Sequence, residues 1–141
     1  KDLPQNTPEY MVAMHFYYDI AGEYDKLYDL YGSESLRISA TNTEANFREG
    51  VYKQEYIVRQ LSTLSAYEFV NMDSSILELI KNDIETNNLT EYTYVSADFK
   101  MTNPAGQQGQ AELSDGDYTF YFLCGKNQTD NDWKIYQLYW D

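Results

Sequence analysis

The residues best suited to acid–base chemistry are one histidine and one carboxylate close to the start of the chain. His15, the only histidine, lies four residues before Asp19 in a segment with helical periodicity. Residues at i and i+4 share one face of a helix, so the imidazole and the carboxylate are placed as a general base and the group that orients it. The pair lies beside the apolar stripe of this segment. That position favours a polar pair on a surface or groove, with ligand contact and a catalytic dyad as the other interpretations.

Two further side chains are candidates for lining a pocket. Gln137 alternates with Trp133 and Ile135, which predicts an amide on the inner face of a sheet, although a hydrogen-bonded core amide fits the same pattern. Tyr17, on the first helical segment, fits either a pocket wall or the core. Our pocket candidates are therefore His15, Asp19, Tyr17 and Gln137, and none of them is assigned a catalytic role.

The spacing of potential ligands predicts neither a metal site nor a cofactor. Zinc needs three or four nitrogen, sulfur or carboxylate ligands, and Cys124 lies far from the histidine on another segment. Asp115 and Asp117 flank a glycine, but the twelve-residue calcium loop with its terminal glutamate is missing. There is also no glycine-rich phosphate loop and no nucleophile motif. We expect Cys124 to be a buried thiol.

Composition narrows the class of partner. The chain has 141 residues, 23 acidic and 10 basic, for a formal net charge of -13. This charge repels phosphate backbones and anionic lipids, so nucleic acid and membrane surfaces are disfavoured as partners. No apolar run approaches the roughly 20 residues that cross a bilayer. Tyrosine is enriched, with 15 residues, and its combination of apolar area and a polar tip suits half-buried sheet positions, protein interfaces or sugar-stacking platforms.

The first half of the chain predicts mainly helices. Thr7, Pro8 and Glu9 form a helix start, and Gly22 can end that helix before a second short one that runs to Gly32. Residues 33–42 alternate like a short strand. Residues 43–61 suggest one bent helix or two short ones, and residues 64–72 another strand.

The second half predicts one helix and then strands. Residues 75–87 have helical spacing behind a cap at Asp73 or Ser74, and residues 91–102 alternate as a strand. Residues 103–106 match a type I turn. The segments 117–126 and 132–140 form an aromatic strand pair. Helices followed by strands that can pair antiparallel indicate an α+β fold, with the helices packed on the sheet.

The closing strand pair is apolar on both faces, so it must be covered twice. The early helices cover one face. For the other face no cover is predicted, which makes it the expected protein interface, and a homodimer is one way to bury it. The interface candidates are Tyr92, Tyr94, Tyr121, Leu123, Tyr136, Leu138 and Trp140.

Several segments resemble the NTF2-like, or cystatin-like, α+β cone superfamily. They are the helix start at Thr7, the glycine-to-acid junction in residues 21–27, and the closing strand at 132–135. The chain also resembles uncharacterised domains of Gram-positive secreted proteins and lipoproteins, such as DUF4829, in its tyrosine-rich composition and in residues 47–64. The resemblance implies a curved antiparallel sheet around a long helix, with a pocket at its wide end. Some members of the superfamily are isomerase-like or dehydratase-like enzymes, and many others only bind partners or dimerise.

Together these patterns predict a short N-terminal linker, residues 1–6, and one domain, residues 7–141. The polar start of the chain, with two prolines, is typical of a segment that follows a signal peptide or lipid anchor. We expect a non-catalytic, extracytoplasmic binding or assembly domain. The alternative is a small-molecule-binding protein or enzyme that uses the cone pocket.

Overall fold

The computed structural model describes residues 3–48, 55–64, 68, 71, 73–103, 114–129 and 131–140. The elements in chain order are α1 (Pro8–Ala21), α2 (Tyr24–Leu30), α3 (Glu34–Arg48), β1 (Glu55–Thr63), α5 (Ser74–Thr86), β2 (Leu89–Thr102), β3 (Gly116–Asn127) and β4 (Lys134–Trp140). The strands form one antiparallel sheet in the order β1-β2-β3-β4. The predicted α+β fold, with helices packed on a curved sheet, is confirmed.

The signals that begin and end α1 act as the sequence predicts. The Thr7 side chain accepts a hydrogen bond from the backbone N–H of Tyr10, and Pro8 occupies the first helical position. Gly22 ends the helix with φ of 74°, a conformation that costs a glycine little. The short helix α2 follows at once, so α1 and α2 form a tight pair.

Residues 33–42, predicted as a strand, are instead the first part of α3. The Ser33 hydroxyl accepts a hydrogen bond from the backbone N–H of Leu36, as a helix cap does. Leu36 and Ala40 are buried one turn apart, whereas Ile38 between them is 52% exposed. The apparent alternation therefore came from an exposed isoleucine that lies between two residues of the buried helix face.

Residues 55–61, predicted as part of a helix, form most of β1. Tyr56 and Val58 point to the core, but the register with β2 shifts between Val58 and Gln60. Such a bulge breaks strand alternation and leaves a spacing that resembles a helix. The strand predicted at 64–72 and the turn predicted at 103–106 fall largely outside the described residues.

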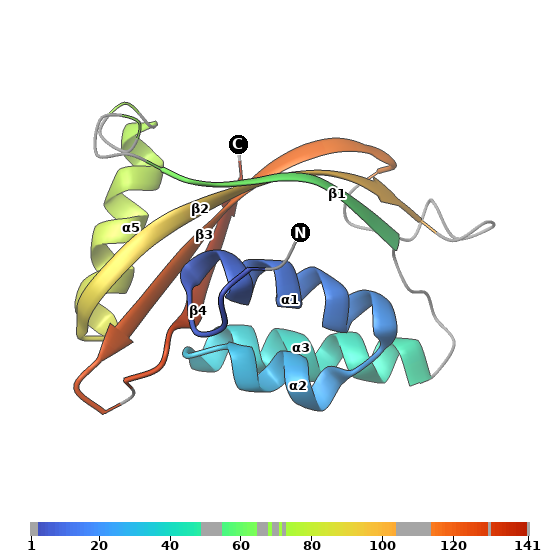
Figure 1. The fold of residues 1–141 in the computed structure, drawn as a ribbon, viewed down its shortest axis with the longest axis horizontal. Coiled ribbons are helices and arrows are strands. Elements are labelled where there is room, and N and C mark those ends of the chain that lie inside the picture. Colours follow the sequence, from blue (N-terminus) through green and yellow to red (C-terminus); the bar gives the residue numbers. More distant parts are fainter. Residues whose placement is uncertain are drawn as a thin grey trace.

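Figure 1 shows α1, α2 and α3 on one side of the curved sheet and α5 at the far end of the sheet, away from them. The main core lies between these three helices and the sheet, with Val12 and Phe16 of α1 packed against Phe99 and Phe122. Helix α3 packs mainly against α2. This leaves room between α3 and the sheet.

A second core contradicts the expectation that the outer sheet face has no cover. Ile76 and Ile80 of α5 pack on this face, and α5 is also held there by a hydrogen bond of 2.5 Å from the Tyr139 hydroxyl to Asp83 Oδ2. The spacing of residues 75–87 predicts this helix but not its position on the sheet. The sheet residues buried beneath or beside it are Leu89, Tyr94, Leu123, Tyr136 and Tyr139.

A bulge in β4 reverses which of its side chains face inward. Ile135 lies opposite Cys124, but Gln137 lies opposite Leu123, so Tyr136 is an extra residue in the ladder. Because side chains alternate along a strand, every position after the bulge changes face relative to simple alternation. Leu138 therefore packs on the inner core, and Gln137 faces the side covered by α5.

Candidate functional site

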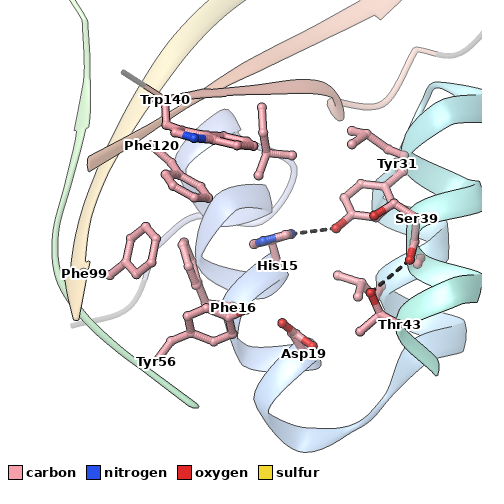
Figure 2. Close-up of a pocket in the computed structure, with 14 residues that line it drawn as sticks. His15, Phe16, Asp19, Tyr31, Ser39, Thr43, Tyr56, Phe99, Phe120 and Trp140 are labelled. Atoms are coloured by element: carbon pink, nitrogen blue, oxygen red, sulfur yellow. Dashed lines mark hydrogen bonds between the residues drawn. The ribbon is translucent and has the colours of Figure 1, made fainter. Parts of the chain in front are cut away.

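A cleft of about 260 Å³ lies between the inner sheet face, α1 and α3. Figure 2 shows its side chains, which come from both ends of the chain. One wall is aromatic and the other mixes aliphatic and hydroxyl groups. The lining residues are His15, Phe16, Asp19, Leu27, Tyr31, Leu36, Ser39, Ala40, Thr43, Tyr56, Phe99, Phe120, Leu138 and Trp140.

The central polar contact of the cleft joins two residues that are far apart in sequence. The Tyr31 hydroxyl lies 2.8 Å from Nδ1 of His15, and Figure 2 shows the two side chains meeting across the cleft. In the tautomer that carries its proton on Nε2, the Tyr31 hydroxyl donates to Nδ1. The imidazole also packs edge-on against Phe16 and Phe122, at centroid distances of 4.9 and 5.1 Å.

Burial keeps this histidine–tyrosine pair neutral. Desolvation by the surrounding rings lowers the pKa of His15 to about 4. Desolvation also raises the pKa of Tyr31 above its usual range, and the negative charge of Asp19 raises it further. Neither group titrates near pH 7, where a general acid or base works best. The pair is therefore suited to hydrogen bonding with a ligand rather than to proton transfer.

Backbone contacts fix the position of Tyr31. Arg37 Nε donates to the Tyr31 carbonyl at 3.0 Å, and the Gly32 N–H donates to the Ile135 carbonyl at 2.8 Å. Tyr31 also forms an isolated parallel bridge with Ile135. A Cβ on Gly32 would lie 2.4 Å from the Tyr136 ring, so any larger residue here requires the bulged residue to shift. The chain is thereby held to β4 just where it enters α3.

Helix α3 contributes one face to the cleft. Leu36, Ser39, Ala40 and Thr43 follow the i, i+3, i+4, i+7 spacing of one helical stripe. The Thr43 hydroxyl donates to the Ser39 carbonyl at 2.9 Å. Ser39 was missed because residues 33–42 were interpreted as a strand, and Thr43 because it was interpreted as the start of a separate helix. The helical stripe is visible in the sequence once the Ser33 cap is taken as the signal.

The opposite wall is a chain of aromatic contacts. Phe16, Phe99 and Phe120 meet with centroid distances of 5.0 Å and 4.9 Å, and Tyr56 lies 5.4 Å from Phe16. Trp140 stacks on Phe120 at 5.0 Å with an interplanar angle of 20°. Trp140 is 47% exposed, so it forms part of the edge of the cleft. Edge and stacked contacts of this kind make a rigid wall.

Of the four predicted pocket candidates, the cleft contains His15 and Asp19. Because they are four residues apart on α1, both side chains line the cleft, as the sequence suggests. The hydrogen bond at Nδ1 of His15, however, is made with Tyr31. Tyr17 is 56% exposed and meets the Tyr18 ring edge-on instead. Gln137 lies on the side covered by α5, where its Oε1 accepts from the backbone N–H of Leu138. The bulge accounts for this last difference.

The seven predicted interface residues do not form one surface. Tyr94, Leu123 and Tyr136 are buried at 4%, 0% and 2% exposure, since α5 covers that face. Leu138 and Trp140 line the cleft. On the outer face, Tyr92 is 47% exposed and Tyr121 is half-buried.

Within the described residues, no three His, Cys, Asp or Glu side chains are grouped so as to hold a metal ion. Cys124 is buried, and burial raises the pKa of its thiol. In the same part of the chain, no helix combines the length and apolarity needed to cross a membrane.

No protein-family model and no curated protein matches this sequence. Among solved structures, the fold is similar to the intermembrane space region of the chloroplast protein ARC6. The TM-score is 0.57 at 11% sequence identity, over 99% of this chain and 98% of that chain. At this identity the similarity concerns the fold, and it agrees with the α+β architecture.

Proposed function

We propose that this chain is a non-catalytic, extracytoplasmic binding domain and that the cleft beneath its sheet is the binding site. The observation that carries this proposal is the hydrogen-bonded His15–Tyr31 pair inside an aromatic cleft. A concave site with apolar walls and a few convergent polar groups is the usual form of a small-ligand pocket. A histidine with a pKa of about 4 is a weak base at pH 7, which favours binding over catalysis.

We also propose that the domain belongs to the NTF2-like cone superfamily, close to the DUF4829 domains. Three helices packed on one side of a curved antiparallel sheet support this assignment. The proposed location outside the cytoplasm is supported by the resemblance to secreted domains, and the structural neighbour comes from an intermembrane space. Fractionation of the native host, with an antibody against this chain, tests the location. Recovery in the cytoplasmic fraction would overturn it.

A ligand-observed NMR screen of small fragments tests the binding site. The matched variant is Ser39→Trp, because Ser39 is exposed at the cleft and a bulky ring there fills the space without disturbing the core. We expect fragments that bind the wild type to lose their signal with Ser39→Trp. If no fragment binds the folded wild type, or if the variant binds them equally, the cleft is not the site.

The same screen examines the alternative, a small-molecule enzyme in this cleft. Asp19 favours that alternative because it lines the cleft together with His15 and Tyr31, giving three convergent titratable groups. An enzyme would convert a bound fragment, and new resonances would grow during incubation. Binding without conversion is the result expected of the proposed function.

Homodimerisation remains a prediction. Because α5 covers Tyr94, Leu123 and Tyr136, Tyr92 at 47% exposure is the predicted outer-face residue best placed to make such a contact. Light scattering at micromolar concentration measures the oligomeric state. A dimer that Tyr92→Lys dissociates would support the interface. A monomer would contradict it and leave the binding cleft unaffected.

A further inference from the structure

The cleft has one charged side chain at pH 7 among the residues that line it. Asp19 carries a negative charge, His15 is neutral because burial lowers its pKa to about 4, and neither lysine nor arginine is among the described lining residues. The charge of Asp19 acts inside the cleft, since it contributes to the raised pKa of Tyr31. The electrostatic potential of the cleft therefore favours cations and disfavours anionic ligands.

The cleft also has two chemically different ends. In Figure 2, Asp19 and Thr43 lie away from the stacked Phe120 and Trp140. A ligand that spans the cleft would meet the Asp19 carboxylate, beside the rings of Phe16 and Tyr56, at one end and the stacked rings at the other. That arrangement matches an amphipathic molecule with a donor at one end and an apolar body at the other.

We propose that the ligand of this cleft is a small primary amine with an aromatic or alkyl body, held by its ammonium group at Asp19. This inference rests on the proposed function of the cleft as a binding site. An ammonium group bound to a carboxylate makes charge-assisted hydrogen bonds, which are about twice as strong as neutral ones. The body of the ligand would pack against the aromatic wall.

The assignment does not require Asp19 to be free of other partners. A carboxylate offers about four acceptor sites, and an ammonium group uses one or two of them. The net charge of the whole chain, -13, adds a weaker attraction for cations, which does not depend on where on the protein the cation lies.

The volume limits the size of this ligand. With about 30 Å³ for each water in the liquid, a cleft of 260 Å³ has room for about nine water molecules. A ligand of roughly ten non-hydrogen atoms fits. 2-Phenylethylamine has this size, and 2-phenylethanol is its neutral counterpart with the same shape.

The test compares these two compounds by tryptophan fluorescence in a Trp133→Phe background. The chain has two tryptophans, so Trp140, which lines the cleft, becomes the only reporter. We expect the amine to bind about tenfold tighter than the alcohol, which is the effect of one charge-assisted contact. Asp19→Asn should remove this preference while the alcohol binds as before. The control variant Asp25→Asn removes one negative charge on the exposed surface of α2 and should leave the preference unchanged.

Three results would overturn the amine assignment. The alcohol could bind as tightly as the amine, the preference could persist in Asp19→Asn, or Asp25→Asn could reduce it as much as Asp19→Asn does. In each of these cases the cleft would still bind a ligand, so the proposed function would stand. If neither compound binds but fragments from the screen do, the ligand class is wrong. If nothing binds the wild type, the proposed function fails with it.

Discussion

His15 is a half-buried ring whose protonation opposes folding. Its pKa is about 4 in the folded protein and 6.5 in the unfolded chain, because the folded site is desolvated. Between these values the unfolded chain binds a proton that the folded chain does not. The contribution of His15 to stability is therefore complete above pH 6.5 and falls as the pH drops toward 4.

This difference in pKa predicts that the free energy of unfolding falls by at most about 3 kcal/mol on acidification, because each pKa unit corresponds to about 1.36 kcal/mol. Urea denaturation between pH 7 and pH 4 measures it, with His15→Gln as the matched variant that hydrogen-bonds without titrating. The wild type should lose more stability than the variant over this range. Because His15 is the only histidine, NMR titration of its ring gives the pKa directly, and a value near 6.5 would contradict the buried pair.

Gly32 is the second residue whose role the structure defines. An added Cβ would lie 2.4 Å from a carbon of the buried Tyr136 ring. We expect Gly32→Ala to destabilise the fold by about 1–3 kcal/mol, the cost of overpacking a rigid core. Gly116→Ala is the control, because its Cβ would have its nearest neighbour at 3.8 Å. Thermal unfolding measures both, and equal stability of the two variants would show that Tyr136 can move aside.

At the scale of elements, α5 is the cover of the outer sheet face. Ile80 is fully buried against this face, while Leu79, its neighbour, is 54% exposed. Truncating a buried isoleucine to alanine costs about 2–5 kcal/mol, whereas an exposed position costs about 0.5 kcal/mol or less. We expect Ile80→Ala, but not Leu79→Ala, to lower the free energy of unfolding by such an amount. Similar effects of the two substitutions would mean that α5 does not pack here.

Local signals in the sequence predicted the elements that have clear caps and an uninterrupted period. The Thr7 cap and Gly22 define α1, Asp73 caps α5, and unbroken alternation defines β2. The errors came from segments in which the apolar pattern does not follow the buried face. The bulge near Arg59 hides β1, and the exposed Ile38 between buried residues makes α3 imitate a strand.

Long-range contacts explain why His15 and Asp19 were the only lining residues predicted as pocket residues. His15 and Asp19 share α1, so their spacing is readable. Tyr31 lies 16 residues from His15 along the chain, and no spacing rule joins them. Leu138 and Trp140 enter the cleft because a bulge at Tyr136 reverses the parity of β4, which depends on pairing with β3 and not on local sequence.

At the scale of the whole molecule, two cores lie on opposite faces of one sheet, and a polar and aromatic cleft between the sheet and α3 is our candidate site. The helices hold His15, Asp19 and Tyr31, and the sheet supplies the aromatic wall. Both termini of the chain thus contribute to one site. The proposed function requires that a ligand occupies this space.

Intermolecular NOEs test that claim most directly. The folded wild type is saturated with a fragment that binds in the screen, and contacts between ligand protons and the protein are recorded. We predict NOEs from the ligand to the His15 ring and to the methyl groups of Leu138, both of which line the cleft. NOEs confined to residues outside the cleft, or a screen that yields no binding fragment, would contradict the account.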